Sequence, residues 1–129
     1  MFSLTKKTDY GLQLMMVLAK KYKQGFVSLR QIAKQEKLPL KFLEQVVFSL
    51  KMAGLVDSKE GKNGGYFLTK SPKKISMAEV IEALEGSVEF GHCFGCPKAS
   101  LCGPKDIWAE VGDKARKTMK GKTLEDLIK

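Results

Sequence analysis

The sequence of 129 residues lacks a long uninterrupted apolar segment and lacks the features of a secretory leader. A membrane-spanning helix needs about 20 consecutive apolar residues, and no segment approaches that length. The N-terminal residues, MFSLTKK, contain neither the apolar core nor the small-residue cleavage site of a signal peptide. We therefore expect a cytoplasmic protein with no membrane partner.

Side chains with catalytic chemistry are also few. There is one histidine, and the sequence shows neither a Ser-His-Asp arrangement nor paired carboxylates in a predicted cleft. Gly121, Lys122 and Thr123 resemble the end of a phosphate-binding loop, but position 116, where that loop requires glycine, is Arg116. We therefore expect that the protein is not an enzyme.

Cysteine occurs three times, always within a segment without hydrophobic periodicity that spans residues 87–103. An odd number of cysteines in a cytoplasmic chain argues against a disulfide framework. Two residues separate Cys93 from Cys96, so both thiolates can turn toward one metal, and Cys102 follows in the same loop. Pro97, directly after Cys96, is typical of iron–sulfur runs. A loop of this length is expected to have a function.

The residues alone leave three interpretations of these cysteines open. Three soft thiolates in a glycine-containing loop suit an iron–sulfur cluster. Zinc, which would need a fourth strong ligand, and a thiol switch form the second interpretation, and incidental cysteines form the third. His92 is an alternative fourth ligand, although its position next to Cys93 makes joint ligation of one metal awkward.

Acidic residues are scarce in the first part of the chain. Residues 1–74 contain 15 Lys and Arg against 5 Asp and Glu, whereas residues 75–129 contain 8 against 9. All of the net charge of +9 therefore comes from the N-terminal part. This asymmetry predicts a surface that binds a polyanion. A solvated lysine-rich surface is the alternative.

Residues 28–54 predict a helix-turn-helix. Ser28 and Gln31 form a capping box at the start of a short helix. Pro39 suits the first turn of a second helix, and Gly54 suits the position just after its end. The second helix has a buried stripe of Leu43, Val46, Val47 and Leu50 and an opposite face of Lys41, Glu44, Gln45 and Phe48.

Two strand candidates follow, at residues 55–58 and 65–69, and Asn63-Gly64 between them is a strong hairpin signal. A helix-turn-helix followed by a hairpin is typical of a winged module, which presents its second helix to the DNA major groove. The residues that we expect at the DNA are Ser28, Arg30, Lys41, Glu44, Gln45, Lys51, Lys59, Lys62 and Asn63.

Further helices are predicted on both sides of this module. Residues 5–22 are apolar nearly all round, which predicts a helix buried on more than one side. A capping box at Ser76 opens another helix, and a long helix runs from Pro104 to about residue 120. We expect that the long helix turns Ile107, Trp108, Val111 and Ala115 inward and that it dimerises the protein.

The predicted fold is mainly α with a small β-wing: a winged helix-turn-helix plus a long C-terminal dimerisation helix. We expect residues 1–74 to form the DNA-binding domain. Residues 75–129 would then contain the cysteine loop and the dimerisation region.

Several motifs together resemble the Rrf-two family of bacterial winged-helix regulators over essentially the whole chain. They are residues 4–12 (LTKKTDYGL), 42–45 (FLEQ), 54–56 (GLV) and 64–66 (GGY), with Leu68, three cysteines before Trp108, and residues 123–127 (TLEDL). The resemblance implies a homodimer, a palindromic double-stranded DNA target and an iron–sulfur cluster, of the 4Fe-4S or 2Fe-2S type, at the cysteine loop.

The resemblance also implies a fourth ligand. Members of the IscR type carry a histidine after the third cysteine, where this chain has Lys105. Members of the NsrR type use a carboxylate from the first helix of the other subunit, and Asp9 matches that position. The implied ligands are therefore Cys93, Cys96, Cys102 and Asp9 of the other subunit, although the first two cysteines are closer together than is usual in the family.

The wing departs from the family as well, because Glu60-Gly61 stands where Arg-Gly is common. A carboxylate is repelled by DNA phosphates, so Lys59 or Lys62 would replace the usual contact. The hypothesis is a dimeric regulator whose operator binding is gated by an iron–sulfur cluster that responds to redox, nitric oxide or iron status. The alternative is a cluster-free repressor of the same fold, switched by zinc or by thiols.

Overall fold

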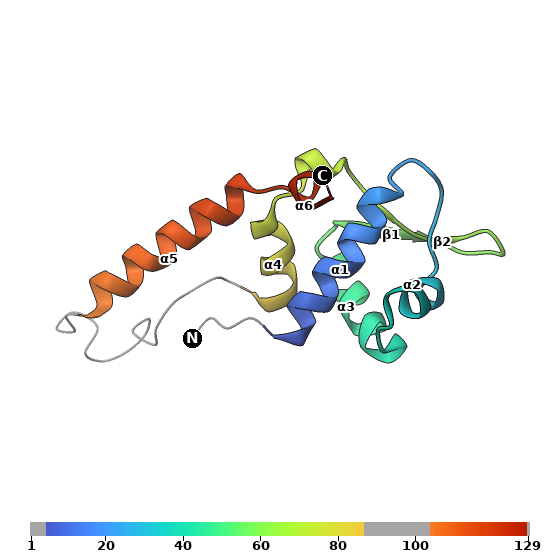
Figure 1. The fold of residues 1–129 in the computed structure, drawn as a ribbon, viewed down its shortest axis with the longest axis horizontal. Coiled ribbons are helices and arrows are strands. Elements are labelled where there is room, and N and C mark those ends of the chain that lie inside the picture. Colours follow the sequence, from blue (N-terminus) through green and yellow to red (C-terminus); the bar gives the residue numbers. More distant parts are fainter. Residues whose placement is uncertain (1–4, 87–103, 129) are drawn as a thin grey trace.

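The computed structural model describes residues 5–86 and 104–128. In chain order the elements are α1 (Lys6–Lys20), α2 (Leu29–Glu36), α3 (Leu40–Met52), β1 (Val56–Lys59), β2 (Gly65–Leu68), a 3-10 turn η1 (Pro72–Lys74), α4 (Met77–Glu85), α5 (Pro104–Gly121) and α6 (Leu124–Ile128). The winged helix-turn-helix fold predicted from the sequence is confirmed. The wing and α2 lie at one end of the molecule, and α5 extends from the other end (Figure 1).

The hydrophobic core is built around α1, which packs against α2, α3, α4, α6 and β2. Helix α1 is thus buried on several sides, as its apolar circumference predicts. The core crosses residue 74, because α4 and α6 contribute to the same cluster as the helix-turn-helix. The fully buried large side chains are Leu14, Met15, Leu18, Ile32, Leu43, Val46, Leu50, Val56, Ile75, Val80 and Leu124.

The helix-turn-helix begins and ends as local chemistry predicts. The Ser28 hydroxyl accepts a hydrogen bond from the Gln31 N–H at 3.1 Å and so caps α2. Gly54, just after α3, has a φ of +80°, which a glycine adopts without strain. One prediction shifts by a position: Pro39 is the N-cap of α3, and the helix begins at Leu40.

The wing is an antiparallel hairpin in which Val56 pairs with Leu68 and Lys59 pairs with Gly65. The hairpin predicted from Asn63-Gly64 is confirmed, although these two residues do not form a two-residue turn. Such a turn needs positive φ at both central residues. Within the wing, positive φ occurs instead at Gly61 (+120°) and Gly65 (+152°), and the Gly64 N–H donates to the Gly61 carbonyl. The connection is therefore the longer loop of residues 60–64.

Gly65 fastens the wing to the body of the protein. A Cβ at this position would lie 2.7 Å from the carbonyl of Val27. Val27 also exchanges two backbone hydrogen bonds with Tyr66, at 3.0 and 2.8 Å. The chain passes too close to Val27 for any side chain at position 65.

Gly65→Ala is expected to lower the free energy of unfolding by about 1–3 kcal/mol, because it combines an unfavourable φ with a backbone clash. Denaturant unfolding followed by circular dichroism measures this change. Gly121→Ala is the control, since a Cβ there meets no atom within 4 Å and the residue is helical. Equal stability of the two variants would contradict the close approach at Gly65.

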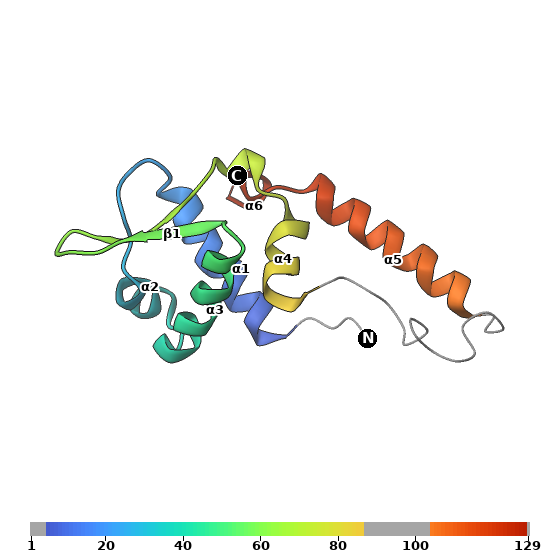
Figure 2. The same cartoon turned by 180° about the vertical axis from the view of Figure 1, so that it is seen from behind.

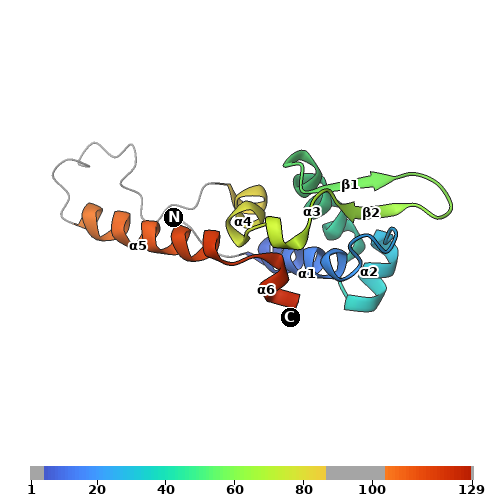
Figure 3. The same cartoon turned by 90° about the horizontal axis from the view of Figure 1, so that it is seen from above.

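The long helix α5 is present with the predicted bounds, but the prediction that its apolar residues face inward is wrong for the single chain. Ile107, Trp108 and Val111 are exposed, and Ala115 is half-buried. The reason is geometric: α5 leaves the body of the protein and extends away from the core (Figure 3). Its C-terminal end is held by the Met77 N–H, which donates to the Lys122 carbonyl at 2.8 Å.

Candidate DNA-binding surface and the position of Asp9

The outer face of α3 presents three predicted DNA-binding residues. Lys41, Glu44 and Gln45 are all exposed, and their i, i+3 and i+4 spacing places them on one side of the helix. The opposite side is anchored in the core by Leu43, Val46, Val47 and Leu50. The burial of that stripe fixes the rotation of α3 and therefore fixes which side chains face outward.

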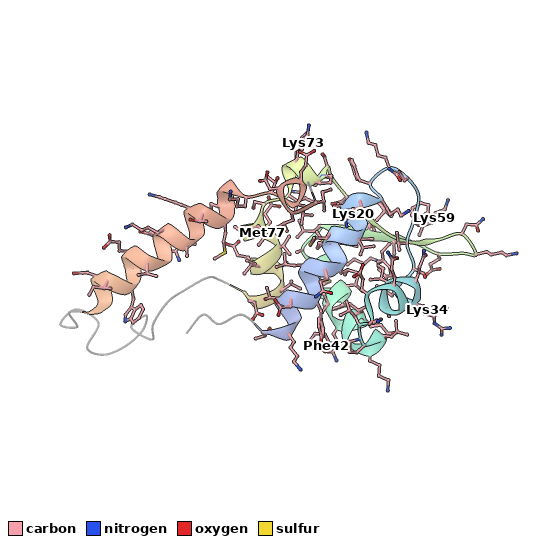
Figure 4. All side chains as sticks on the ribbon, viewed as in Figure 1. Lys20, Lys34, Phe42, Lys59, Lys73 and Met77 are labelled. Carbon is pink, nitrogen blue, oxygen red and sulfur yellow. The ribbon has the colours of Figure 1, made fainter. Side chains whose placement is uncertain are left out.

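Helix α2 lies beside α3 and adds positive charge to the same end of the molecule. Arg30 is exposed in its first turn, whereas the hydroxyl of Ser28 is already engaged in capping. Lys34, which the sequence prediction did not include, is exposed as well. Lys34 on α2 and Lys59 on the wing lie on the side of the molecule away from α5 (Figure 4).

Lys51, another residue predicted to lie at the DNA, contacts the wing. Its Nζ donates a 2.7 Å hydrogen bond to the Ser58 hydroxyl and lies 3.8 Å from the Asp57 carboxylate. These contacts join the last turn of α3 to β1, and Figure 2 shows these two elements from behind. Lys51 therefore connects α3 to the wing, and the Asp57 carboxylate partly compensates its charge.

The wing carries the remaining predicted residues. Lys62 and Asn63 are exposed in the loop, as is Glu60. Lys59 lies with its Nζ 5.4 Å from the centroid of the Phe26 ring, and Phe26 contacts Phe67 edge-to-face at 5.2 Å. A cation over an aromatic face is attracted by the ring. Lys59 thus lies over the Phe26 ring, an arrangement that sequence reasoning missed because Phe26 lies far from Lys59 in the chain.

Sequence reasoning also left Phe48 out of the candidate site. The side chain was placed on the outer face of α3, but only polar residues were assigned to DNA. In the structure Phe48 is 65% exposed and stands among those polar residues. The helical periodicity alone already predicted that Phe48 lies on the outer face of α3, and this position was the available signal.

Asp9 is exposed in the first turn of α1. The turn is tied to the end of α4, because the Thr8 hydroxyl donates a 2.6 Å hydrogen bond to the Glu85 carboxylate and the Thr5 hydroxyl donates a second. Glu85 is the last residue of α4 and shortly precedes the cysteine segment. Asp9 is therefore exposed in a turn whose threonines contact the last residue of α4.

The Glu85 contact depends on the carboxylate being ionised. Burial raises the pKa of Glu85, but hydrogen bonds from Thr5 and Thr8, with a smaller contribution from nearby Lys7, together lower it below its ordinary value. A depressed pKa means that the contact stabilises the folded state above the unfolded-state pKa. This stabilisation is lost as the pH falls through the folded-state pKa.

His92, Cys93, Cys96 and Cys102 lie outside the described residues. Within residues 5–86 and 104–128, no group of three or more His, Cys, Asp or Glu side chains is arranged to hold a metal ion. Within the same ranges, no helix combines the length and the apolar character that crossing a bilayer requires.

A capped helix-turn-helix, an exposed polar face on its second helix and a two-stranded wing that carries Lys59 and Lys62 are typical of a winged-helix transcriptional regulator. Residues 4–129 match the family described as Rrf2, iron-dependent transcriptional regulator. The chain belongs to the Rrf2 family.

Individual relatives support this assignment. The chain is 35% identical over 124 residues to the HTH-type transcriptional regulator CymR of Bacillus subtilis, covering 96% of this chain and 88% of that protein. It is 32% identical over 128 residues to IscR of Pectobacterium carotovorum, covering 97% and 78%.

Solved structures agree. CymR of B. subtilis, described as its global cysteine regulator, superposes with a TM-score of 0.85 at 34% identity and covers 99% of this chain and 97% of its own. IscR of T. potens superposes with a TM-score of 0.81 at 33% identity, covering 98% and 86%.

Proposed function

We propose that this protein is a dimeric transcriptional regulator whose binding to a palindromic operator is gated by an iron–sulfur cluster. The observation that carries the proposal is that α1, the helix with Asp9, lies in the same hydrophobic core as α3. Helix α1 carries Asp9 near its N-terminal end and packs against α3, the helix with the exposed polar face. A change at Asp9 therefore acts on an element in direct contact with the candidate DNA-reading helix.

The DNA surface comprises the outer face of α3, the first turn of α2 and the wing. Lys and Arg on these elements would neutralise phosphates, while Glu44 and Gln45 are positioned to read base edges. Lys51 would act by fixing the wing against α3 and not as a free cation, because its ammonium already contacts Ser58 and Asp57.

The cluster would be held by Cys93, Cys96, Cys102 and Asp9 of the other subunit. The donor set fits this group, because three thiolates with one oxygen ligand complete four positions and Asp9 is exposed rather than engaged in the core. When bound, the cluster would supply a redox-active group that is sensitive to oxidants, nitric oxide and iron loss. Asp9, the hardest of the four ligands, would be the one most easily released.

The apolar side of α5 supports the dimer. Ile107, Trp108 and Val111 are all exposed on a helix that extends away from the core. A second copy related by a two-fold axis would cover them and would place two recognition helices on a palindrome. In this proposal residues 1–74 bind DNA, and residues 75–129 sense and dimerise.

The fourth ligand is tested by substituting Asp9 and His92 separately. We expect Asp9→Ala to lower the iron content and the visible absorbance of protein reconstituted without oxygen, whereas His92→Ala keeps both. If Asp9 only interacts favourably with the dipole of α1, Asp9→Ala would lower the free energy of unfolding by about 0.3–1 kcal/mol and leave the iron content unchanged. A full cluster in Asp9→Ala together with its loss in His92→Ala would assign the ligand to His92.

A further inference from the structure

Phe48 is a large apolar side chain on the part of the fold where charged and polar groups gather. It is 65% exposed, although α3 buries its apolar stripe completely on the other side. Exposing an aromatic ring to water forgoes the stabilisation that its burial would give. No described element covers this ring, so the fold of the single chain does not explain its presence.

The position of Phe48 on α3 is the informative feature. Lys41, Glu44, Gln45 and Phe48 follow one another at i, i+3, i+4 and i+7, and all four are exposed. A helix that lies in the major groove contacts bases with this same set of positions. Phe48 therefore completes the face that carries the candidate base-reading residues.

We propose that Phe48 determines specificity by packing its ring against the 5-methyl group of a thymine in the major groove. This inference rests on the proposed DNA-binding function. Phenylalanine has no hydrogen-bonding group, so it cannot read the donors and acceptors of the base edges. The thymine methyl is the apolar group that the major groove offers, and phenylalanine is among the side chains that contact it.

The surroundings of Phe48 favour DNA over a second copy of the chain as its partner. Lys41 lies on the same face of α3, and Arg30 and Lys34 are exposed on the neighbouring α2. This positive charge attracts a polyanion and would repel an identical surface. The exposed apolar residues of α5, which suit a second copy, lie at the opposite end of the molecule (Figures 1 and 3).

Selection of duplexes from a random library by the full-length protein, followed by base replacement, tests this role. The protein is used in whichever form, reconstituted or metal-free, binds more tightly. We expect one A·T pair per half-site to be enriched with the wild-type protein and not with Phe48→Ser. Replacing that thymine by uracil, which lacks only the methyl group, should weaken wild-type binding by about fourfold per half-site. It should leave Phe48→Ser unaffected.

Met52→Ser is the matched control. Met52 is 74% exposed on the same helix but is its last residue, farthest from the N-terminal part that contacts bases. Circular dichroism checks folding, and sedimentation velocity checks the oligomeric state of all variants. Equal uracil sensitivity in wild type and Phe48→Ser, the same change in Met52→Ser, or loss of the dimer in Phe48→Ser would each overturn the inference. Failure of the wild-type protein to select any duplex would overturn the DNA-binding proposal instead.

Discussion

Alanine at any one of Cys93, Cys96 or Cys102 is expected to abolish the visible absorbance and most of the bound iron of protein reconstituted without oxygen. With one thiolate removed, three ligands remain, and one of these is the weak oxygen donor Asp9. The expected effect is near-complete loss and not a graded reduction. Iron analysis and an absorbance spectrum of each purified variant measure it.

Ser100→Ala is the control for these variants. Ser100 lies in the same segment between Cys96 and Cys102, and its hydroxyl is not a proposed ligand. The variant should keep the iron content of the wild type. If the wild type itself stays colourless and free of iron after reconstitution, the cluster is excluded, and the cluster-free repressor switched by zinc or thiols takes its place.

The affinity for DNA is expected to depend steeply on salt, because each phosphate that a Lys or Arg neutralises releases condensed counterions. A protein that makes about 6–10 phosphate contacts loses about 10³–10⁵-fold in affinity between 50 and 200 mM salt.

Gln45→Ala should weaken binding to the specific site by about 1–3 kcal/mol, with the salt slope retained. Lys41→Ala should weaken binding as well. Fluorescence anisotropy titrations over a series of salt concentrations measure both quantities.

Lys117→Ala provides the matched control for Lys41→Ala. Both lysines are exposed and helical, but Lys117 lies on α5, away from the wing and α2. The control should keep the wild-type affinity and slope. If Lys117→Ala lowers the affinity while Lys41→Ala and Gln45→Ala do not, the DNA-binding surface lies outside the helix-turn-helix.

Much of the fold could be predicted because its signals are local. The caps at Ser28 and Ser76 involve hydrogen bonds across three residues, and both are present in the structure. The buried stripe of α3 follows from helical periodicity alone. The hairpin also follows from a local signal at Asn63-Gly64, whereas the close approach of Gly65 to Val27 joins distant segments and no local pattern encodes it.

The prediction that the apolar residues of α5 face inward was wrong for another reason. An amphipathic pattern shows that one side of a helix avoids water, but it does not say whether the same chain provides the cover. Trp108 is exposed here because α5 leaves the core.

In the candidate site too, features set by local patterns could be predicted, and contacts between distant segments could not. Lys41, Glu44 and Gln45 are exposed as predicted, because their positions depend only on the stripe that they oppose. The contacts of Lys51 with Ser58 and of Lys59 with Phe26 depend on how β1 packs, which no local pattern encodes. Phe48 was overlooked because residue type, and not position, was used to select candidates for DNA contact.

Gating is tested most directly by measuring the affinity of one operator duplex for the wild-type protein with and without its cluster, under anaerobic conditions and at a fixed salt concentration. Helix α1 joins Asp9 to α3, so ligation should change the placement of the recognition helices. We predict that the two forms differ in affinity by a coupling free energy of about 1–3 kcal/mol, which is about 5–150-fold. Equal affinities of the two forms would contradict gating by the cluster.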